Sequence, residues 1–284
     1  MSARGWGVAV LGKVADLPGY AEVYWRLAVA GFRRQWHYKL AMFAGLFTNS
    51  VFGFVRASVM VAAVGATGGF AGYDAGSIGA YVWISQGLLG ALQFMAAELE
   101  LAERIRTGDI VVDFLRPVDL QLSNLATDLG RAVCALLPRM VPSLLIGSLT
   151  FGLVLPGTPE SYLLGMLSIL LASAISFLAL FALTTAGFWV VETRGIRTLY
   201  QTCGPFLAGL FVPVHIFPDW LRAFATATPF PSMLQAPVDV LSGRVTGWAA
   251  VQVVGVQIFW LLAVCALGRV LLAAGRRKLE VQGG

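Results

Sequence analysis

The chain has 284 residues, of which 58% are hydrophobic and 12% are charged, and its net charge is +5. Soluble domains carry about 25% charged residues, so this composition excludes an ordinary soluble protein and predicts an all-α polytopic membrane protein. In such a chain the distribution of Lys and Arg between loops matters more than their sum, so the positive charge does not indicate nucleic acid. Cys134, Cys203 and Cys265 lie far apart in apolar surroundings, which predicts neither disulfides nor a metal site.

Two N-terminal segments precede the first long apolar run. Residues 1–18 are weakly patterned, and we expect a cytoplasmic tail. From Gly19 to Tyr38 aromatic residues alternate with cations, as in Tyr24-Trp25-Arg26. Because this mixture suits a helix lying among lipid headgroups, we predict an amphipathic helix over residues 19–38. The alternative is a simple flank of the first span.

Apolar stretches of about 20 residues, long enough to cross the hydrocarbon layer, recur along the chain. They predict one transmembrane domain over residues 19–275 and a cytoplasmic C-terminal tail over 276–284. The six predicted spans are residues 40–65, 78–97, 132–155, 162–190, 199–217 and 248–273. Pro138 and Pro142 interrupt the third span, and Pro205 and Pro213 interrupt the fifth.

The loop charges predict the orientation. Sixteen Lys and Arg residues fall on the side of the two termini and of the loops after the second and fourth spans, against Arg222 and Arg244 on the other side. Cytoplasmic loops are the ones enriched in Lys and Arg. Both termini and the polar segment 98–124 are therefore expected in the cytoplasm, and the proline-rich segment 218–247 outside.

Polar residues inside the predicted first span are candidates for a translocation path. Asn49 and Arg56 lie there, and no carboxylate occurs at a comparable depth in any predicted span. Intramembrane polar groups are costly and often functional. The structural alternative is that Arg56 extends its charge toward the membrane surface.

No catalytic motif is evident. The sequence contains no GxxxxGK[ST], GxSxG or HExxH motif. Its two histidines, His37 and His215, are predicted on opposite sides of the membrane. We therefore predict no catalytic residues, no metal site and no cofactor bound by this chain.

The densest cluster of charge runs from Glu103 to Pro117. Asp109 is a candidate N-cap, and Ile110, Val111, Phe114 and Leu115 fall on one side of a helix that Pro117 ends. Asp113 is expected to pair with Arg116. A helix of about two turns is unstable alone, so it must pack on something: the membrane surface or, as we favour, a soluble partner.

The same segment, ERIRTGDIVVDFLRPVDL over Glu103–Leu120, resembles the signature of ABC-2-type transporter permeases, in a bacterial subgroup of largely unassigned substrate. Further similar blocks are Gly187-Phe188-Trp189 with residues 192–196, and residues 209–213, 217–221 and 228–230 with Pro237. They occur in the family's order over about residues 20–275.

The resemblance implies a six-span exporter subunit of the bacterial inner membrane, with a cytoplasmic coupling helix and short re-entrant helices at the outer mouth. Two permeases, identical or paralogous, would combine with two ABC ATPase subunits, which would hold ATP and Mg²⁺. The residues that would face the ATPase or shape the coupling helix are Glu103, Arg104, Arg106, Gly108, Asp109, Asp113, Arg116 and Pro117. A second cytoplasmic contact would be formed by Glu192, Arg194 and Arg197.

Two other classes stay open at this point. A secondary carrier or channel would use Arg56 and the broken fifth span as its path, and a membrane-embedded enzyme would act on lipid.

Overall fold

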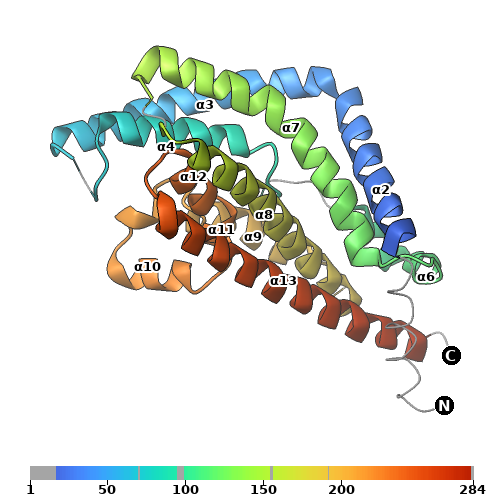
Figure 1. Cartoon of the computed structure of the whole chain (residues 1–284). Helices are drawn as coiled ribbons and strands as arrows, with labels where there is room; N and C mark the ends of the chain where they lie inside the picture. The colour runs from blue at the N-terminus through green and yellow to red at the C-terminus, as the bar shows by residue number, and fades with distance from the viewer. Residues whose placement is uncertain (1–16, 70, 95–98, 154–155, 191, 283–284) are drawn as a thin grey trace.

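The computed structural model of the chain describes residues 17–69, 71–94, 99–153, 156–190 and 192–282. Regular structure in these ranges is entirely helical (Figure 1). The helices are α2 (Leu17–His37), α3 (Lys39–Ala66), α4 (Ala75–Leu88), α5 (Glu100–Thr107), α6 (Ile110–Phe114), α7 (Leu120–Phe151), α8 (Pro159–Thr184), η2 (Thr185–Phe188), α9 (Arg194–Leu207), η3 (Val214–Ile216), α10 (Asp219–Thr226), α11 (Phe230–Met233), α12 (Gln235–Leu241) and α13 (Gly247–Gln282). The predicted tail lies outside the described residues except for residues 17 and 18, which begin α2.

Four helices are long and apolar enough to cross a membrane: α3, α7, α8 and α13. They correspond to the first, third, fourth and sixth predicted spans. In the second and fifth predicted spans the helices are shorter than expected: α4 and α9 have 14 residues each. At 1.5 Å per residue each covers about 21 Å, which is less than the hydrocarbon layer.

Local sequence explains where α4 begins. The Asp74 carboxylate accepts the backbone N–H of Ser77 at 2.7 Å, and the Ser77 hydroxyl accepts the backbone N–H of Asp74 at 2.9 Å. The bond from the Ser77 N–H, and a further one that the Ser77 hydroxyl donates to the same carboxylate, lower the pKa of Asp74. Such a reciprocal pair satisfies two backbone groups that a helix start leaves without partners. Beyond Leu88 the backbone leaves the helix, but residues 91–94 remain buried.

Two helices run further than predicted. The Asp119 carboxylate accepts the backbone N–H of Leu122 at 2.8 Å, so α7 begins twelve residues before the predicted third span. It continues through Pro138 and Pro142, and Figure 1 shows it bent along its length, as expected where proline removes a helix hydrogen bond. α13 continues to Gln282, so most of the predicted C-terminal tail is helical.

α8 is the central helix. In its apolar stretch 67% of the residues are buried, against 17% in α3, 33% in α7 and 22% in α13. It packs against α13, α12 and α7. The other three long helices therefore expose apolar faces, which in a membrane protein contact lipid or another subunit.

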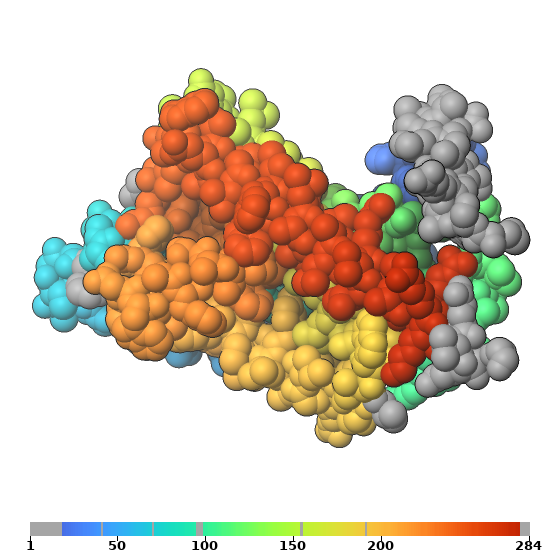
Figure 2. Space-filling model, turned by 90° about the horizontal axis from the view of Figure 1, so that it is seen from below, coloured from blue at the N-terminus to red at the C-terminus, as the bar shows by residue number. Residues whose placement is uncertain are grey.

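The two ends of the bundle differ. Figure 1 places the start of α2, α6 and the end of α13 at one end, and α10–α12 at the other. Figure 2 shows α13 crossing the molecule between them. At the first end Arg269 lies 3.6 Å from Asp119, and Arg276 lies over the Phe114 ring at 5.4 Å. The arginine-rich segments thus gather at one end, as the charge count predicts.

Candidate functional site

The charged segment folds as two short helices. α5 ends at Gly108, whose φ of +83° lies in the left-handed region that glycine adopts without strain. The chain turns there and begins α6, which has five residues. The predicted helix begins where expected, after Asp109, but it is shorter than two turns because α6 ends at Phe114. The helix on the other side of the turn, α5, was not predicted.

The position predicted for Asp109 is confirmed, but its predicted capping hydrogen bond is not formed. Asp109 does occupy the N-cap position of α6, but its side chain makes no hydrogen bond to the helix N–H groups. Its carboxylate instead accepts the hydroxyl hydrogen of Thr107 at 2.7 Å. Asp109 therefore braces the turn between α5 and α6.

A buried carboxylate holds the segment together. Asp113 is 4% exposed, and its two oxygens lie 2.8 Å from Arg104 Nε and 3.4 Å from Arg116 Nη1. The predicted pair with Arg116 is confirmed. The Arg104 partner could not be predicted, because the turn at Gly108 is what brings α5 beside α6. This clamp joins α5, α6 and the chain before Pro117.

The apolar residues of α6 divide between two sides. Ile110 is fully buried, in a cluster with Leu101 and Ile105 of α5 and with Phe181 of α8. Val111, Val112 and Leu115 are 50%, 54% and 80% exposed. Only Ile110 and half-buried Phe114 of the predicted face point inward. The exposed residues form an apolar tip, consisting of Val111, Val112 and Leu115.

The second predicted contact lies at the same end of the molecule. η2, which closes α8, packs against α5, and a Cβ added at Gly187 would lie 3.4 Å from Ile105. After η2 the Glu192 carboxylate accepts the backbone N–H of Arg194 at 3.0 Å, where α9 begins. Arg197 follows in the first turn of α9. The structure thus places η2, which precedes this loop in the chain, against α5.

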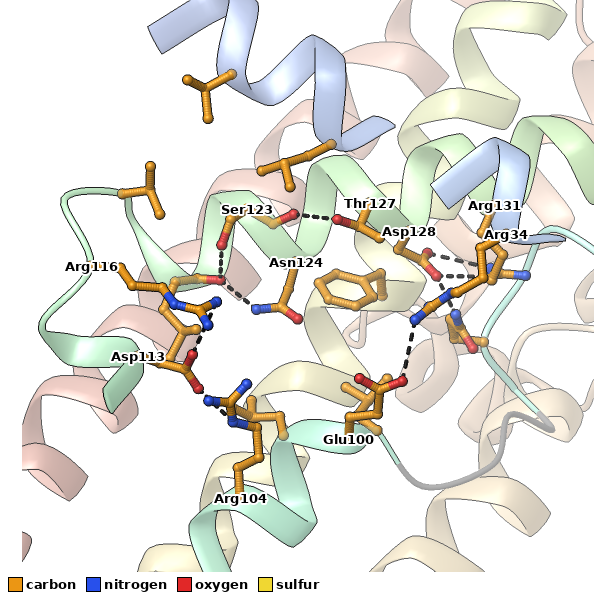
Figure 3. A pocket seen from close by; sticks show the side chains of 18 residues that line it. Arg34, Glu100, Arg104, Asp113, Arg116, Ser123, Asn124, Thr127, Asp128 and Arg131 are labelled. Atoms are coloured by element: carbon orange, nitrogen blue, oxygen red, sulfur yellow. Dashed lines mark hydrogen bonds and ion pairs between the residues drawn. The ribbon is translucent and has the colours of Figure 1, made fainter. Parts of the chain in front are cut away.

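A cavity of about 540 Å³ lies behind the charged segment (Figure 3). α2, α5, the turn between α6 and α7, and the first three turns of α7 form its walls. Its charged residues are Arg34, Glu100, Arg104, Asp113, Arg116, Asp128 and Arg131. Arg34 Nη1 lies 3.2 Å from Glu100 Oε1, so an ion pair links α2 to α5 across it.

A buried polar cluster closes the inner end of this cavity. Arg131 of α7 donates to the carbonyl oxygens of Gly90 at 3.0 Å and Ala91 at 2.8 Å, and its Nε lies 2.6 Å from Asp128 Oδ1. Gln93 also bonds to Asp128, and its backbone N–H donates to the Ser176 hydroxyl at 2.6 Å. Non-helical backbone at membrane depth is tolerated where protein satisfies its polar groups.

This cluster explains the short α4 and corrects one assignment. Residues 89–94 leave the helix because side chains from α7 and α8 replace the lost backbone partners. Arg131 had been counted among the loop charges, but it lies inside α7 and is 19% exposed. The buried role of Arg131 was hard to predict from the sequence, because only its spacing of three residues from Asp128 indicates an ion pair.

The two candidate path residues lie on one face of α3. Asn49 donates to the carbonyl oxygen of Gln86 at 3.2 Å, and Arg56 donates to the Ser85 hydroxyl at 2.9 Å. Both therefore contact α4. The Nε and Nη2 atoms of Arg56 are buried and have no hydrogen-bond partner among the described residues.

A second polar network, missed in the sequence, joins α4 to the segment between α9 and α13. The Tyr81 hydroxyl lies 2.7 Å from both Gly209 O and Gln235 Oε1, and Gln235 donates to Asp239 at 2.8 Å. His215 Nε2 lies 2.8 Å from the other oxygen of Asp239. Residues 208–213, within the predicted fifth span, are not helical, and side chains of this network bond to the backbone of Gly209 and Val214. Among the described residues no group of three or more His, Cys, Asp or Glu could hold a metal ion.

Four long apolar helices and a polar, folded segment at one end define a multi-pass membrane protein. A comparison with models of known families matches residues 47–283 to the ABC-2 family transporter proteins. The chain belongs to this family and is a transport permease, a membrane component and not itself a catalytic subunit. The resemblance seen in the sequence is thereby confirmed. No curated protein matches the chain.

Proposed function

We propose that this chain is the translocating subunit of an ATP-driven exporter in a bacterial cytoplasmic membrane, docked to a separate ABC ATPase that holds ATP and Mg²⁺. Permeases of this family generally work with such an ATPase. The observation that carries the proposal is the apolar tip on α6, held out from the bundle by a short, internally clamped segment. Interfaces are commonly organised around an apolar centre with a polar rim.

The contacts of the segment offer a route for movement. A push on α6 reaches α5 through the Asp113 clamp and α8 through Ile110. The chain then continues into α7, where Arg131 holds the carbonyl groups of Gly90 and Ala91. In this proposal the ATPase moves α6, and the polar cluster passes that movement to the non-helical part of the second crossing.

The rest of the assembly follows the family pattern. We propose six crossings, with α4 and α9 continued by residues 89–94 and 208–213, and both termini in the cytoplasm. The exposed apolar faces of α3 and α13 leave room for a second permease, identical or paralogous. Two buried nitrogens of Arg56 lack partners in the described part of the chain, which supports a translocation path along the contact of α3 and α4, beside Asn49.

Co-purification tests the proposal. The full chain, extracted in mild detergent, is expected to retain a protein that mass spectrometry identifies as a P-loop ATPase. The double variant Val111→Asp/Leu115→Asp should retain at least tenfold less, because a carboxylate would be desolvated at the interface. Trp220→Asp, at a 73% exposed position of α10 in the opposite end of the bundle, is the matched control. Purification of an active transporter without any ATPase would overturn the proposal.

A further inference from the structure

The cavity behind the charged segment has a mixed lining of charged, polar and apolar side chains. α5 and the start of α7 supply Arg104, Ser123 and Asn124, whereas α2 supplies the apolar Val23 and Leu27 together with Arg34. Figure 3 shows Arg104 and Arg116 together on one side, Arg34 on the opposite side, and Asn124 between them. A ligand that fits must therefore be both polar and apolar.

The charge of the lining favours an anion. Four arginines face three carboxylates across the cavity, which leaves one positive charge in excess. The excess positive charge lies around Asp113, because this one carboxylate pairs with both Arg104 and Arg116. Arg104 uses Nε for that contact, and Arg116 and Arg34 each use one Nη. Their other N–H groups have no partner among the described residues. Arginine N–H groups in this number suit phosphate oxygens.

The position of the cavity relative to the membrane indicates that the anion is a lipid headgroup. Ser123 to Arg131 occupy the first turns of α7, a helix long and apolar enough to span the membrane. These residues therefore lie where a span leaves the hydrocarbon layer, at the level of lipid headgroups. The side chains of Val23 and Leu27 on α2 give a fatty-acyl chain an apolar surface to lie on.

We propose that this cavity binds an anionic phospholipid of the inner leaflet, with its phosphate between Arg104, Arg116 and Arg34 and an acyl chain against α2. The bound lipid bridges α2 to the Asp113 clamp and so stabilises the charged segment against the bundle. This inference requires α7 to span the membrane, but it does not depend on the ATPase partnership.

Native mass spectrometry of the purified full chain tests the proposal, with phosphatidylglycerol and phosphatidylcholine of identical acyl chains as probes. The expected preference for phosphatidylglycerol is about tenfold, the ratio that one charge-assisted hydrogen bond supplies. The triple variant Arg104→Gln/Asp113→Asn/Arg116→Gln removes one net positive charge without leaving a buried carboxylate. Arg26→Gln, on α2 but outside this cavity, removes the same net charge and is the control.

A second variant tests whether the space of the cavity, and not only its charge, is needed for lipid binding. Asn124→Trp fills the space between the arginines and leaves the net charge unchanged. Loss of the preference in the triple variant and in Asn124→Trp, with retention in Arg26→Gln, supports the proposal. Equal binding of the two lipids by the wild-type chain overturns it, as does a preference that survives Asn124→Trp. Displacement of the lipid by equimolar glycerol phosphate would assign the site to a soluble phosphate and would also overturn it.

Discussion

At the scale of single residues, the structure depends on a few charges that are buried and paired. Asp113 and Asp128 are 4% and 6% exposed, and each is held by arginine. Breaking a buried pair costs more than the pair contributes, because an uncompensated charge remains. Replacing one member of such a pair should therefore lower the stability of the protein more than replacing both members together.

Arg131 and Asp128 allow a direct test of this expectation. Arg131→Gln leaves the Asp128 carboxylate unpaired and weakens the hydrogen bonds to Gly90 and Ala91, so we expect the free energy of unfolding to fall by about 3–5 kcal/mol. Arg131→Gln/Asp128→Asn should recover part of this loss, because no buried charge is left alone. Thermal unfolding in detergent measures both. Equal loss in the single and double variants would contradict the account.

At the scale of helices, α2 joins the bundle through backbone contact with α7. A Cβ added at Gly31 would overlap the carbonyl oxygen of Thr127, and one added at Gly130 would overlap that of Ala28. Small residues allow helices in membranes to approach this closely. Since α2 also forms one wall of the cavity, its position matters beyond packing.

Gly31→Ala is expected to destabilise the protein by about 1–3 kcal/mol, the usual cost of overpacking. Gly19→Ala provides the control on the same helix, because a Cβ there meets nothing within 4 Å, and its effect should stay within about 0.5 kcal/mol. Hydrogen exchange of α2, followed by mass spectrometry, would show whether the helix loosens. Unchanged protection of α2 in Gly31→Ala would refute the proposed role of the contact.

These elements also show how far the sequence leads. Apolar length predicted the four long helices, and the blocks around Glu103 to Leu120 predicted the family. The ends of α4 and α9 could not be predicted, because the non-helical backbone after each is stabilised by residues distant in the chain, such as Arg131, Ser176 and Gln235. The helix after Asp109 was predicted but ends earlier than expected, at Phe114, and α5 before Gly108 was not predicted.

At the scale of the whole molecule, the different residues at its two ends predict its orientation in the membrane. The apolar tip and the arginine-rich segments lie at one end, and α10–α12 lie at the other (Figure 1). Lys and Arg are retained on the cytoplasmic side. The apolar tip should therefore be reachable only from the cytoplasm.

Cysteine labelling in intact cells tests this orientation. In a variant lacking Cys134, Cys203 and Cys265, Trp220→Cys should react with a membrane-impermeant maleimide, whereas Leu115→Cys should react only after permeabilisation. Both positions are well exposed, at 73% and 80%, so access and not burial decides the result. The reverse pattern would place the charged segment outside the cell and exclude ATPase docking there.

If α6 is the surface on which an ATPase acts, site-specific photo-crosslinking will capture the two proteins at this position. A photoreactive amino acid replaces Leu115 in one variant and Trp220 in another, and each is irradiated in native membranes. We predict that position 115 forms an adduct containing peptides of a P-loop ATPase, and that position 220 does not. Absence of ATPase peptides from the adducts at position 115, with equal expression of both variants, would contradict the account.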